Sequence, residues 1–122
     1  MPVVFQGGGG QVFWVKPDTS LRLTSLTIGG NAGMAGAAVY NEGTTSLDGV
    51  AVTDNTAYGG AAIFNVGHME IEGSAISGNQ NHADPALGGA IYSSGTLYVG
   101  GTSITGNAAL GNWQDFGGAL CN

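Results

Sequence analysis

The nonapeptide Ile71-Glu-Gly-Ser-Ala-Ile-Ser-Gly-Asn79 recurs along this chain, and its recurrence decides the fold. The other three copies are Leu23-Thr-Ser-Leu-Thr-Ile-Gly-Gly-Asn31, Leu47-Asp-Gly-Val-Ala-Val-Thr-Asp-Asn55 and Val99-Gly-Gly-Thr-Ser-Ile-Thr-Gly-Asn107. The terminal asparagines stand 24, 24 and 28 residues apart (31 to 55, 55 to 79, 79 to 107). A period in this range is typical of a solenoid, in which each repeat forms one coil that stacks on the next.

A second block follows each asparagine. Its copies are Gly36-Ala-Ala-Val-Tyr-Asn-Glu-Gly43, Gly60-Ala-Ala-Ile-Phe-Asn-Val-Gly67, Gly88-Gly-Ala-Ile-Tyr-Ser-Ser-Gly95 and the shorter Gly117-Gly-Ala-Leu-Cys-Asn122. Each closing glycine precedes the next terminal asparagine by 12 residues (43 to 55, 67 to 79, 95 to 107). A spacing this constant indicates a repeated structural unit.

Aliphatic residues alternate with small or polar residues in the first block. Equivalent positions in the four copies carry Leu23, Leu47, Ile71 and Val99, and then Ile28, Val52, Ile76 and Ile104. Aliphatic side chains with period two, many of them β-branched, are typical of strands. Coils stacked at the spacing of hydrogen-bonded strands, ~4.8 Å, would join these columns into one core. The sequence therefore predicts an all-β fold, a single-stranded parallel β-helix of about four and a half coils.

The repeats also predict the domain organisation. We expect one β-helix domain over residues 1–122, with an N-terminal segment and partial coil in 1–20 and four repeats in 21–122.

The repeated glycines and asparagines are expected to have backbone roles. Gly43, Gly67 and Gly95 are predicted to occupy turn positions with positive φ, which glycine adopts without steric penalty. The asparagines are predicted to form a ladder at a corner, each side-chain amide bonding the next coil and satisfying backbone groups that the bend leaves unpaired. The members of this ladder are Asn31, Asn55, Asn79 and Asn107.

Composition and charge exclude several classes of partner. The net charge is −6 and the chain has only two basic residues, so it cannot neutralise phosphates and nucleic acid is not expected as a partner. No run of 18 apolar residues exists, so no membrane span is expected. Cys121 is the only cysteine, which excludes an internal disulfide framework.

The repeat resembles that of the chlamydial polymorphic outer-membrane proteins. Gly-Gly-Ala-Ile at 88–91 and Gly-Gly-Ala-Leu at 117–120 are similar to the Gly-Gly-Ala-Ile motif of that family. The blocks that end at the ladder asparagines resemble its Phe-x-x-Asn motif, with an aliphatic residue in place of phenylalanine. The resemblance covers about residues 10–122. It implies a right-handed parallel β-helix on a bacterial surface or in a secreted protein, often with an adhesive role. Gly36-Ala37 and Gly60-Ala61 depart from the paired glycines.

Many parallel β-helices are polysaccharide lyases or hydrolases, which need clustered carboxylates or Ca²⁺ with a cation. Asp48 and Glu72 are equivalent in register, so they are expected to lie about 5 Å apart and could bind a cation. The alternative is a solvated surface pair. Arg22 has no second cation on the neighbouring coils. We therefore expect no catalytic residues, no cofactor and no enzymatic activity.

Aromatic residues suggest one binding surface. If strand alternation places Val39, Ile63, Ile91 and Leu120 inside, the column Trp14, Tyr40, Phe64, Tyr92 and Cys121 faces outward. An exposed aromatic column could stack on sugar rings or pack against a protein. The opposite parity would place the aromatic residues in the core.

Two longer connections, 80–87 and 108–116, suggest a second surface because long loops on a regular scaffold often carry function. Both follow a ladder asparagine, so they are expected to emerge on the same edge. The candidate residues there are His82, Asp84, Trp113, Asp115 and Phe116.

The two ends of the chain suggest self-association. The last coil stops part-way at Asn122, while the first residues form half a coil, so subunits are expected to stack head to tail. The alternative is that this chain is part of a longer β-helix. We expect a structural β-solenoid of a bacterial surface or extracellular matrix, a fibre subunit or an adhesin scaffold with a polysaccharide or cell-surface ligand. A carbohydrate-binding or polysaccharide-processing module is the alternative function.

Overall fold

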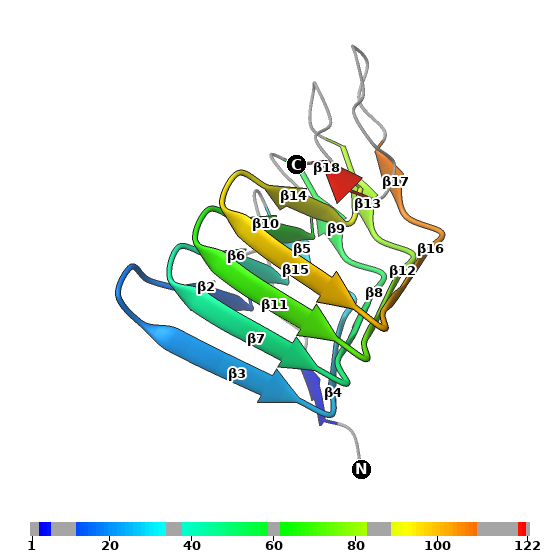
Figure 1. Cartoon of the computed structure of the whole chain (residues 1–122). Helices are drawn as coiled ribbons and strands as arrows, with labels where there is room; N and C mark the ends of the chain where they lie inside the picture. Colours follow the sequence, from blue (N-terminus) through cyan, green and yellow to red (C-terminus); the bar gives the residue numbers. More distant parts are fainter. Residues whose placement is uncertain are drawn as a thin grey trace.

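The computed structural model describes residues 3–5, 12–33, 38–58, 62–82, 89–109 and 120–121. These residues form four parallel sheets, and no helix is found among them. The chain visits the sheets in a fixed order, so each coil contributes one strand to every sheet and stacks on the coil before it (Figure 1). The prediction of an all-β parallel solenoid is therefore confirmed.

We name the sheets by the order in which one coil meets them after the aromatic positions. Sheet B contains β2 (Phe13–Val15), β6 (Val39–Asn41), β10 (Ile63–Asn65), β14 (Ile91–Ser93) and β18 (Leu120–Cys121). Sheet C contains β3 (Ser20–Thr24), β7 (Thr44–Asp48), β11 (His68–Glu72) and β15 (Thr96–Gly100). Sheet A contains β1 (Val3–Phe5), β4 (Leu26–Gly29), β8 (Ala51–Thr53), β12 (Ala75–Ser77) and β16 (Ser103–Thr105). Sheet D contains β5 (Ala32–Gly33), β9 (Thr56–Ala57), β13 (Gln80–Asn81) and β17 (Ala108–Ala109).

The stacked sheets amount to a solenoid of about 3 turns. The sequence-based count of about four and a half coils includes partial coils in which many residues lie outside the described ranges. That count and the right hand of the helix stay predictions.

The register places equivalent residues of successive coils side by side. Ile28 pairs with Val52, which pairs with Ile76, and all three are fully buried. A second column of the core is made by Val39, Ile63 and Ile91, and a third by Leu23, Leu47 and Ile71. Burying one such side chain stabilises the fold by about 1.5–3 kcal/mol. Each coil therefore depends on its neighbours for a closed core.

The asparagines at the end of the first block form a buried ladder between sheets A and D. The Nδ2 of Asn31 donates to the Oδ1 of Asn55 at 2.9 Å, and the amide of Asn55 donates to Asn79 at 3.0 Å. Asn79 in turn donates to Asn107 at 2.9 Å. Each rung also bonds backbone, since the Nδ2 of Asn55 donates to the Ile28 carbonyl at 3.1 Å. The ladder thus satisfies the corner and joins four coils along the axis.

A second ladder, which the sequence analysis missed, lies between sheets B and C. Asn41 donates to the Oδ1 of Asn65 at 2.8 Å, and Asn65 donates to the hydroxyl of Ser93 at 3.1 Å. The Oδ1 of Asn41 also accepts from the Thr45 hydroxyl at 2.9 Å. The signal was present, because these residues share one position of the Val-Tyr-Asn, Ile-Phe-Asn and Ile-Tyr-Ser blocks.

The prediction for the closing glycines was wrong. Gly43, Gly67 and Gly95 do not have positive φ; that conformation belongs to Gly30, Gly49, Gly73, Gly78, Gly101 and Gly106 among the described glycines. Gly67 is needed because a Cβ there would collide with the backbone carbonyl of Gly43, and a Cβ at Gly95 would collide with that of Gly67. Close approach of one coil to the next, not the turn conformation, therefore requires these glycines.

No helix of the described residues is long and apolar enough to cross a membrane.

Candidate binding surfaces

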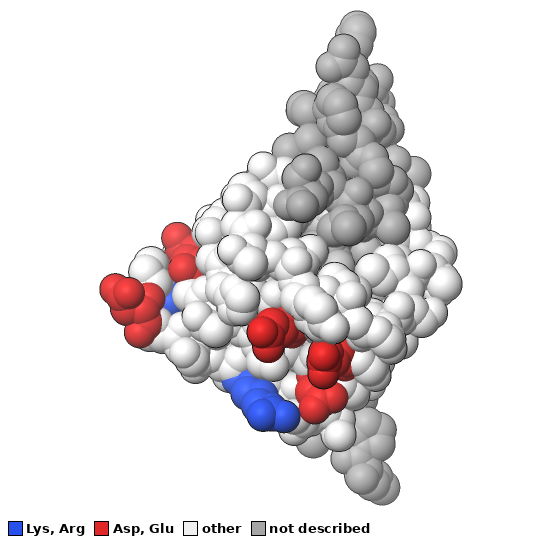
Figure 2. Space-filling view, in the orientation of Figure 1, with Lys and Arg blue, Asp and Glu red and all other residues white. Residues whose placement is uncertain are grey.

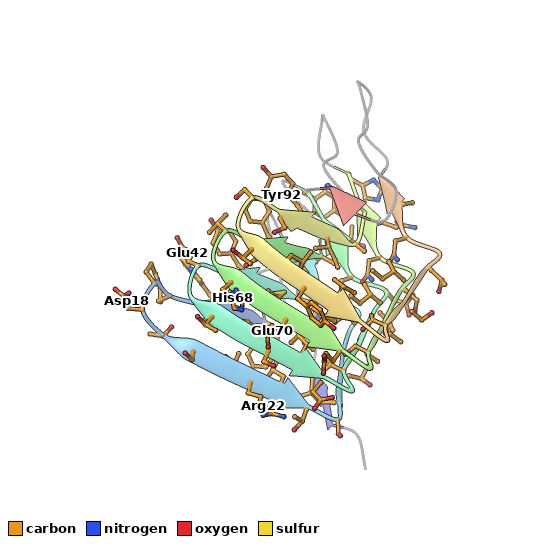
Figure 3. The ribbon with its side chains drawn as sticks, viewed as in Figure 1. Asp18, Arg22, Glu42, His68, Glu70 and Tyr92 are labelled. Atoms are coloured by element: carbon orange, nitrogen blue, oxygen red, sulfur yellow. The ribbon has the colours of Figure 1, made fainter. Side chains whose placement is uncertain are left out.

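The column of aromatic residues lies on the outer face of sheet B. Val39, Ile63 and Ile91 are fully buried, which turns the residue after each one outward. Trp14 is 53% exposed, and the other three aromatic rings are half-buried. Figure 3 shows Tyr92 at the outer edge of its coil. We refer to Trp14, Tyr40, Phe64 and Tyr92 as the aromatic column; Cys121 continues it in backbone register beside Tyr92.

The four rings of the aromatic column contact one another in series. Tyr40 and Phe64 stack with their ring centroids 5.2 Å apart and their planes 9° from parallel. Phe64 and Tyr92 lie 4.7 Å apart with a tilt of 30°, and Trp14 meets Tyr40 edge-on at 5.8 Å. Aromatic pairs in these geometries stabilise by about 0.5–1.5 kcal/mol beyond the area they bury. The column therefore joins the coils from outside as the asparagine ladders do from inside.

Polar groups hold the Trp14 end of the column. The indole Nε1 donates to Glu42 Oε1 at 2.7 Å, and Lys16 Nζ lies 3.5 Å from the centroid of the Trp14 ring. Lys16 thus makes a cation–π contact on one face of Trp14. The remaining rings use their faces on each other, so the column presents ring edges to solvent. This arrangement suits packing between coils better than stacking on sugar rings, which needs an open ring face.

The outer face of sheet C is polar and carries most of the described charge. We call it the polar face; its outward residues are Ser20, Arg22, Thr24, Thr44, Ser46, Asp48, His68, Glu70, Glu72, Thr96, Tyr98 and Gly100. Figure 2 shows basic and acidic side chains gathered there, and Figure 3 labels Arg22, His68 and Glu70 on its strands. The register aligns Arg22, Ser46, Glu70 and Tyr98 in one column.

The predicted Asp48 and Glu72 pair lies on the polar face, directly opposite in register. Asp48 is also within 3.4 Å of the Arg22 guanidinium, and both side chains are largely exposed. Among the described residues, no group of three or more His, Cys, Asp or Glu could hold a metal ion. Arg22 compensates Asp48 on the coil below, so the pair behaves as part of a solvated charge network.

Tyr98 is a surface residue that the sequence analysis did not single out. It is 54% exposed, and the end of its ring lies over Gly100, where a Cβ would stand 2.9 Å from the Tyr98 hydroxyl oxygen. Gly100 therefore leaves the space into which Tyr98 leans. Alignment of the 24- and 28-residue offsets would have placed Tyr98 in the column with Glu70, but its strand has a strand-like alternation that gives it no special mark.

The predicted loop surface can be followed only at its first residue. His82 is exposed, accepts or donates a contact of 3.1 Å with Gln80 Oε1, and stacks on Tyr58 with ring centroids 5.7 Å apart. Asp84, Trp113, Asp115 and Phe116 lie outside the described residues.

Together the geometry defines the chain as a parallel β-solenoid with two asparagine ladders, an aromatic column and a charged polar face. Comparison of the chain with protein-family models, with curated proteins and with solved structures finds no match.

Proposed function

We propose that this chain is a non-enzymatic structural solenoid of a bacterial surface or extracellular matrix, stacking head to tail into a fibre or serving as an adhesin scaffold. A right-handed helix of the kind that the chlamydial outer-membrane repeat implies is part of the proposal. The Gly-Gly-Ala-Ile and x-x-Asn blocks that resemble that repeat support the location at the cell surface or outside the cell.

The observation that carries the proposal is the set of continuous ladders along the axis. Asn31 to Asn107 are linked rung by rung inside the corner, and the aromatic column links the same coils outside. Within the described residues, every buried side-chain nitrogen and oxygen has a hydrogen-bond partner. Satisfied buried networks of this type make a structure rigid. A rigid rod that transmits its register from coil to coil suits a structural role.

The positions of the carboxylates also favour a structural role over catalysis. The described aspartates and glutamates lie at exposed or half-exposed positions of the outer surface. General acid–base catalysis works best where carboxyl groups are shielded and their protonation is tuned by burial. Asp48 is instead compensated by Arg22 in solvent, at 3.4 Å.

Charge is distributed unevenly along the axis, and this supports head-to-tail stacking. Both basic residues, Lys16 and Arg22, lie on the first coil, whereas Glu70 and Glu72 lie on the third. Stacking in the same direction brings the basic coil of one copy toward the acidic coils of the next. A head-to-head contact would bring like charges together, which is unfavourable.

Electron microscopy of the purified chain at several concentrations tests this function. We expect unbranched fibres with an axial repeat of about 20–25 Å, roughly one subunit at the strand spacing. Arg22→Glu is expected to reduce fibre formation, and Arg22→Lys, which keeps the charge, is the matched control. Discrete particles at every concentration, with both variants unchanged, would contradict fibre assembly and leave the scaffold of a binding module.

Activity on acidic polysaccharides tests the non-enzymatic part. We expect no product from a panel of such substrates. Product that disappears in Asp48→Ala or Glu72→Ala would show that the chain is an enzyme.

A further inference from the structure

The polar face contains one place where negative charge is left uncompensated. Glu72 has no hydrogen-bond partner among the described residues, and Glu70 has only His68, whose Nε2 lies 3.5 Å from Glu70 Oε1. The two basic residues of the chain are engaged elsewhere, Lys16 on the Trp14 ring and Arg22 on Asp48. The charge of these two glutamates is therefore available to a cation from outside.

An aromatic ring lies beside the same two carboxylates. Glu70 is opposite Tyr98 and Glu72 is opposite Gly100, over which the Tyr98 ring leans. Paired strands are ~4.8 Å apart, so the ring flanks both glutamates. An exposed aromatic ring next to carboxylates attracts ammonium and guanidinium groups, through the ring quadrupole and through ion pairing. Charge and aromaticity thus both select a cationic ligand.

The spacing of the carboxylates matches one kind of cationic ligand. Glu70 and Glu72 are alternate outward residues of β11, so their Cα atoms lie about 6.6 Å apart at the rise of a strand. Alternate side chains of an extended polypeptide have the same spacing. We propose that Tyr98, Glu70 and Glu72 form a docking site for an extended basic segment of a partner protein, with arginine or lysine at two alternate positions. This inference goes beyond the scaffold function and does not depend on fibre formation.

Nuclear magnetic resonance titration of the isotope-labelled full chain tests the site. The probe is the peptide Ac-Gly-Arg-Ser-Arg-Gly-NH₂ at low salt, and Ac-Gly-Arg-Arg-Ser-Gly-NH₂ is the spacing control, because adjacent side chains of an extended peptide point to opposite sides. We expect saturable shifts on β11 and β15 with the first peptide and weaker binding of the second. Binding is expected to weaken as salt is raised, since the contacts are exposed.

Variants separate the site from general attraction to an acidic protein. Glu72→Gln and Tyr98→Ala are each expected to weaken binding about two- to five-fold, as exposed ion pairs and cation–π contacts do. The double variant Glu70→Gln/Glu72→Gln is expected to lose about tenfold, if the two losses multiply. Gly100→Ala keeps the tyrosine but displaces its ring, and is expected to weaken binding as well. Asp18→Asn removes the same charge at the far end of the polar face and is expected to leave binding nearly unchanged (Figure 3).

Three outcomes would overturn the proposal. The first is unchanged affinity of the double glutamine variant while circular dichroism shows it folded. The second is an equal loss in Asp18→Asn, which would mean non-specific attraction. The third is tighter binding of a glucosamine oligomer that the same variants abolish, which would make the ligand a basic polysaccharide instead of a polypeptide.

Discussion

Two corners of the solenoid carry a column of glycines, and they carry it for different reasons. At the corner between sheets B and C, Gly43, Gly67 and Gly95 have no space for a side chain because the preceding coil's backbone lies against them. At the corner between sheets C and A, Gly49, Gly73 and Gly101 have positive φ and open space around them. Ser25 occupies the first position of the second column with φ 51°.

The difference shows what a repeated glycine can mean in a solenoid. The first column records how closely coils approach, which is a property of two coils. The second records how one coil bends, which is a property of a single residue. A serine is tolerated in the second column because the strain of left-handed backbone is limited to about 1–2 kcal/mol per residue. A backbone collision has no comparable local remedy. Substitutions at the two corners should therefore differ in size.

The largest effect is expected for Gly67→Ala at the corner between sheets B and C. The new Cβ would collide with the Gly43 carbonyl oxygen and lie 2.9 Å from the carbonyl carbon of Glu42. Backbone atoms cannot move aside without disturbing the second asparagine ladder. We expect a loss of about 3 kcal/mol in the free energy of unfolding, at the upper end for overpacking. Urea unfolding followed by circular dichroism measures it, and a loss below that of Gly73→Ala would contradict the comparison.

Asn65→Ala is expected to have the next largest effect, at the same corner. Its amide donates to Ser93 Oγ and to the Thr96 carbonyl, and its Oδ1 accepts from Asn41 and from the Gly67 backbone N–H at 3.2 Å. Truncation leaves several buried groups unpaired, and we expect about 2 kcal/mol of destabilisation. Asn65→Asp, which keeps the acceptor and removes the donor, separates the two halves of the interaction in the same unfolding assay. An alanine variant as stable as the parent would mean that this ladder does not stabilise the corner.

Gly73→Ala tests the corner between sheets C and A. Its φ is 55° and the nearest atom to a new Cβ, Asp48 Oδ1, is 4.0 Å away. Only the conformational penalty applies, so we expect a loss of about 1 kcal/mol. The shift in the midpoint of thermal unfolding measures this loss. A loss as large as that of Gly67→Ala would show that the corners do not differ.

The smallest effect is expected for Ser25→Gly, at the other end of that column. Glycine relieves the left-handed strain of Ser25 but loses more conformational entropy on folding, by about 0.5–1 kcal/mol. The two terms nearly cancel, and the stability should change by less than about 0.5 kcal/mol. Measured under the same conditions as Gly73→Ala, a loss above 1 kcal/mol would indicate a side-chain role for Ser25.

The fold was predictable from the sequence because the repeat carries it redundantly. The columns of Ile28, Val52 and Ile76 identify the strands, and the asparagines mark one corner in every coil. The reason for Gly67 was not predictable, since collision with the preceding coil depends on distances that no single repeat encodes. The second ladder was missed because Ser93 replaces asparagine and interrupts the pattern.

The candidate surfaces were predictable only in part. Alternation left two directions open for the aromatic column, and the burial of Val39, Ile63 and Ile91 decides between them. The site at Tyr98 depends on a leaning ring and on Gly100 two residues later, a relation that composition and periodicity do not reveal. Arg22 likewise reaches Asp48 across coils, one pairing position away from its own register partner Ser46.

The connection between sheets D and B absorbs every change in repeat length without shifting a ladder. Gln80 pairs with Thr56 at an offset of 24 residues, whereas Ile91 pairs with Ile63 at an offset of 28, so four residues are added between those strands alone. Sheets C and A then continue at the new offset with every column intact. Insertions or deletions at this connection are therefore invisible to the rest of the fold. A lineage could diversify what the rod displays there, or a protein engineer could graft a foreign peptide, while the frame that holds it stays constant.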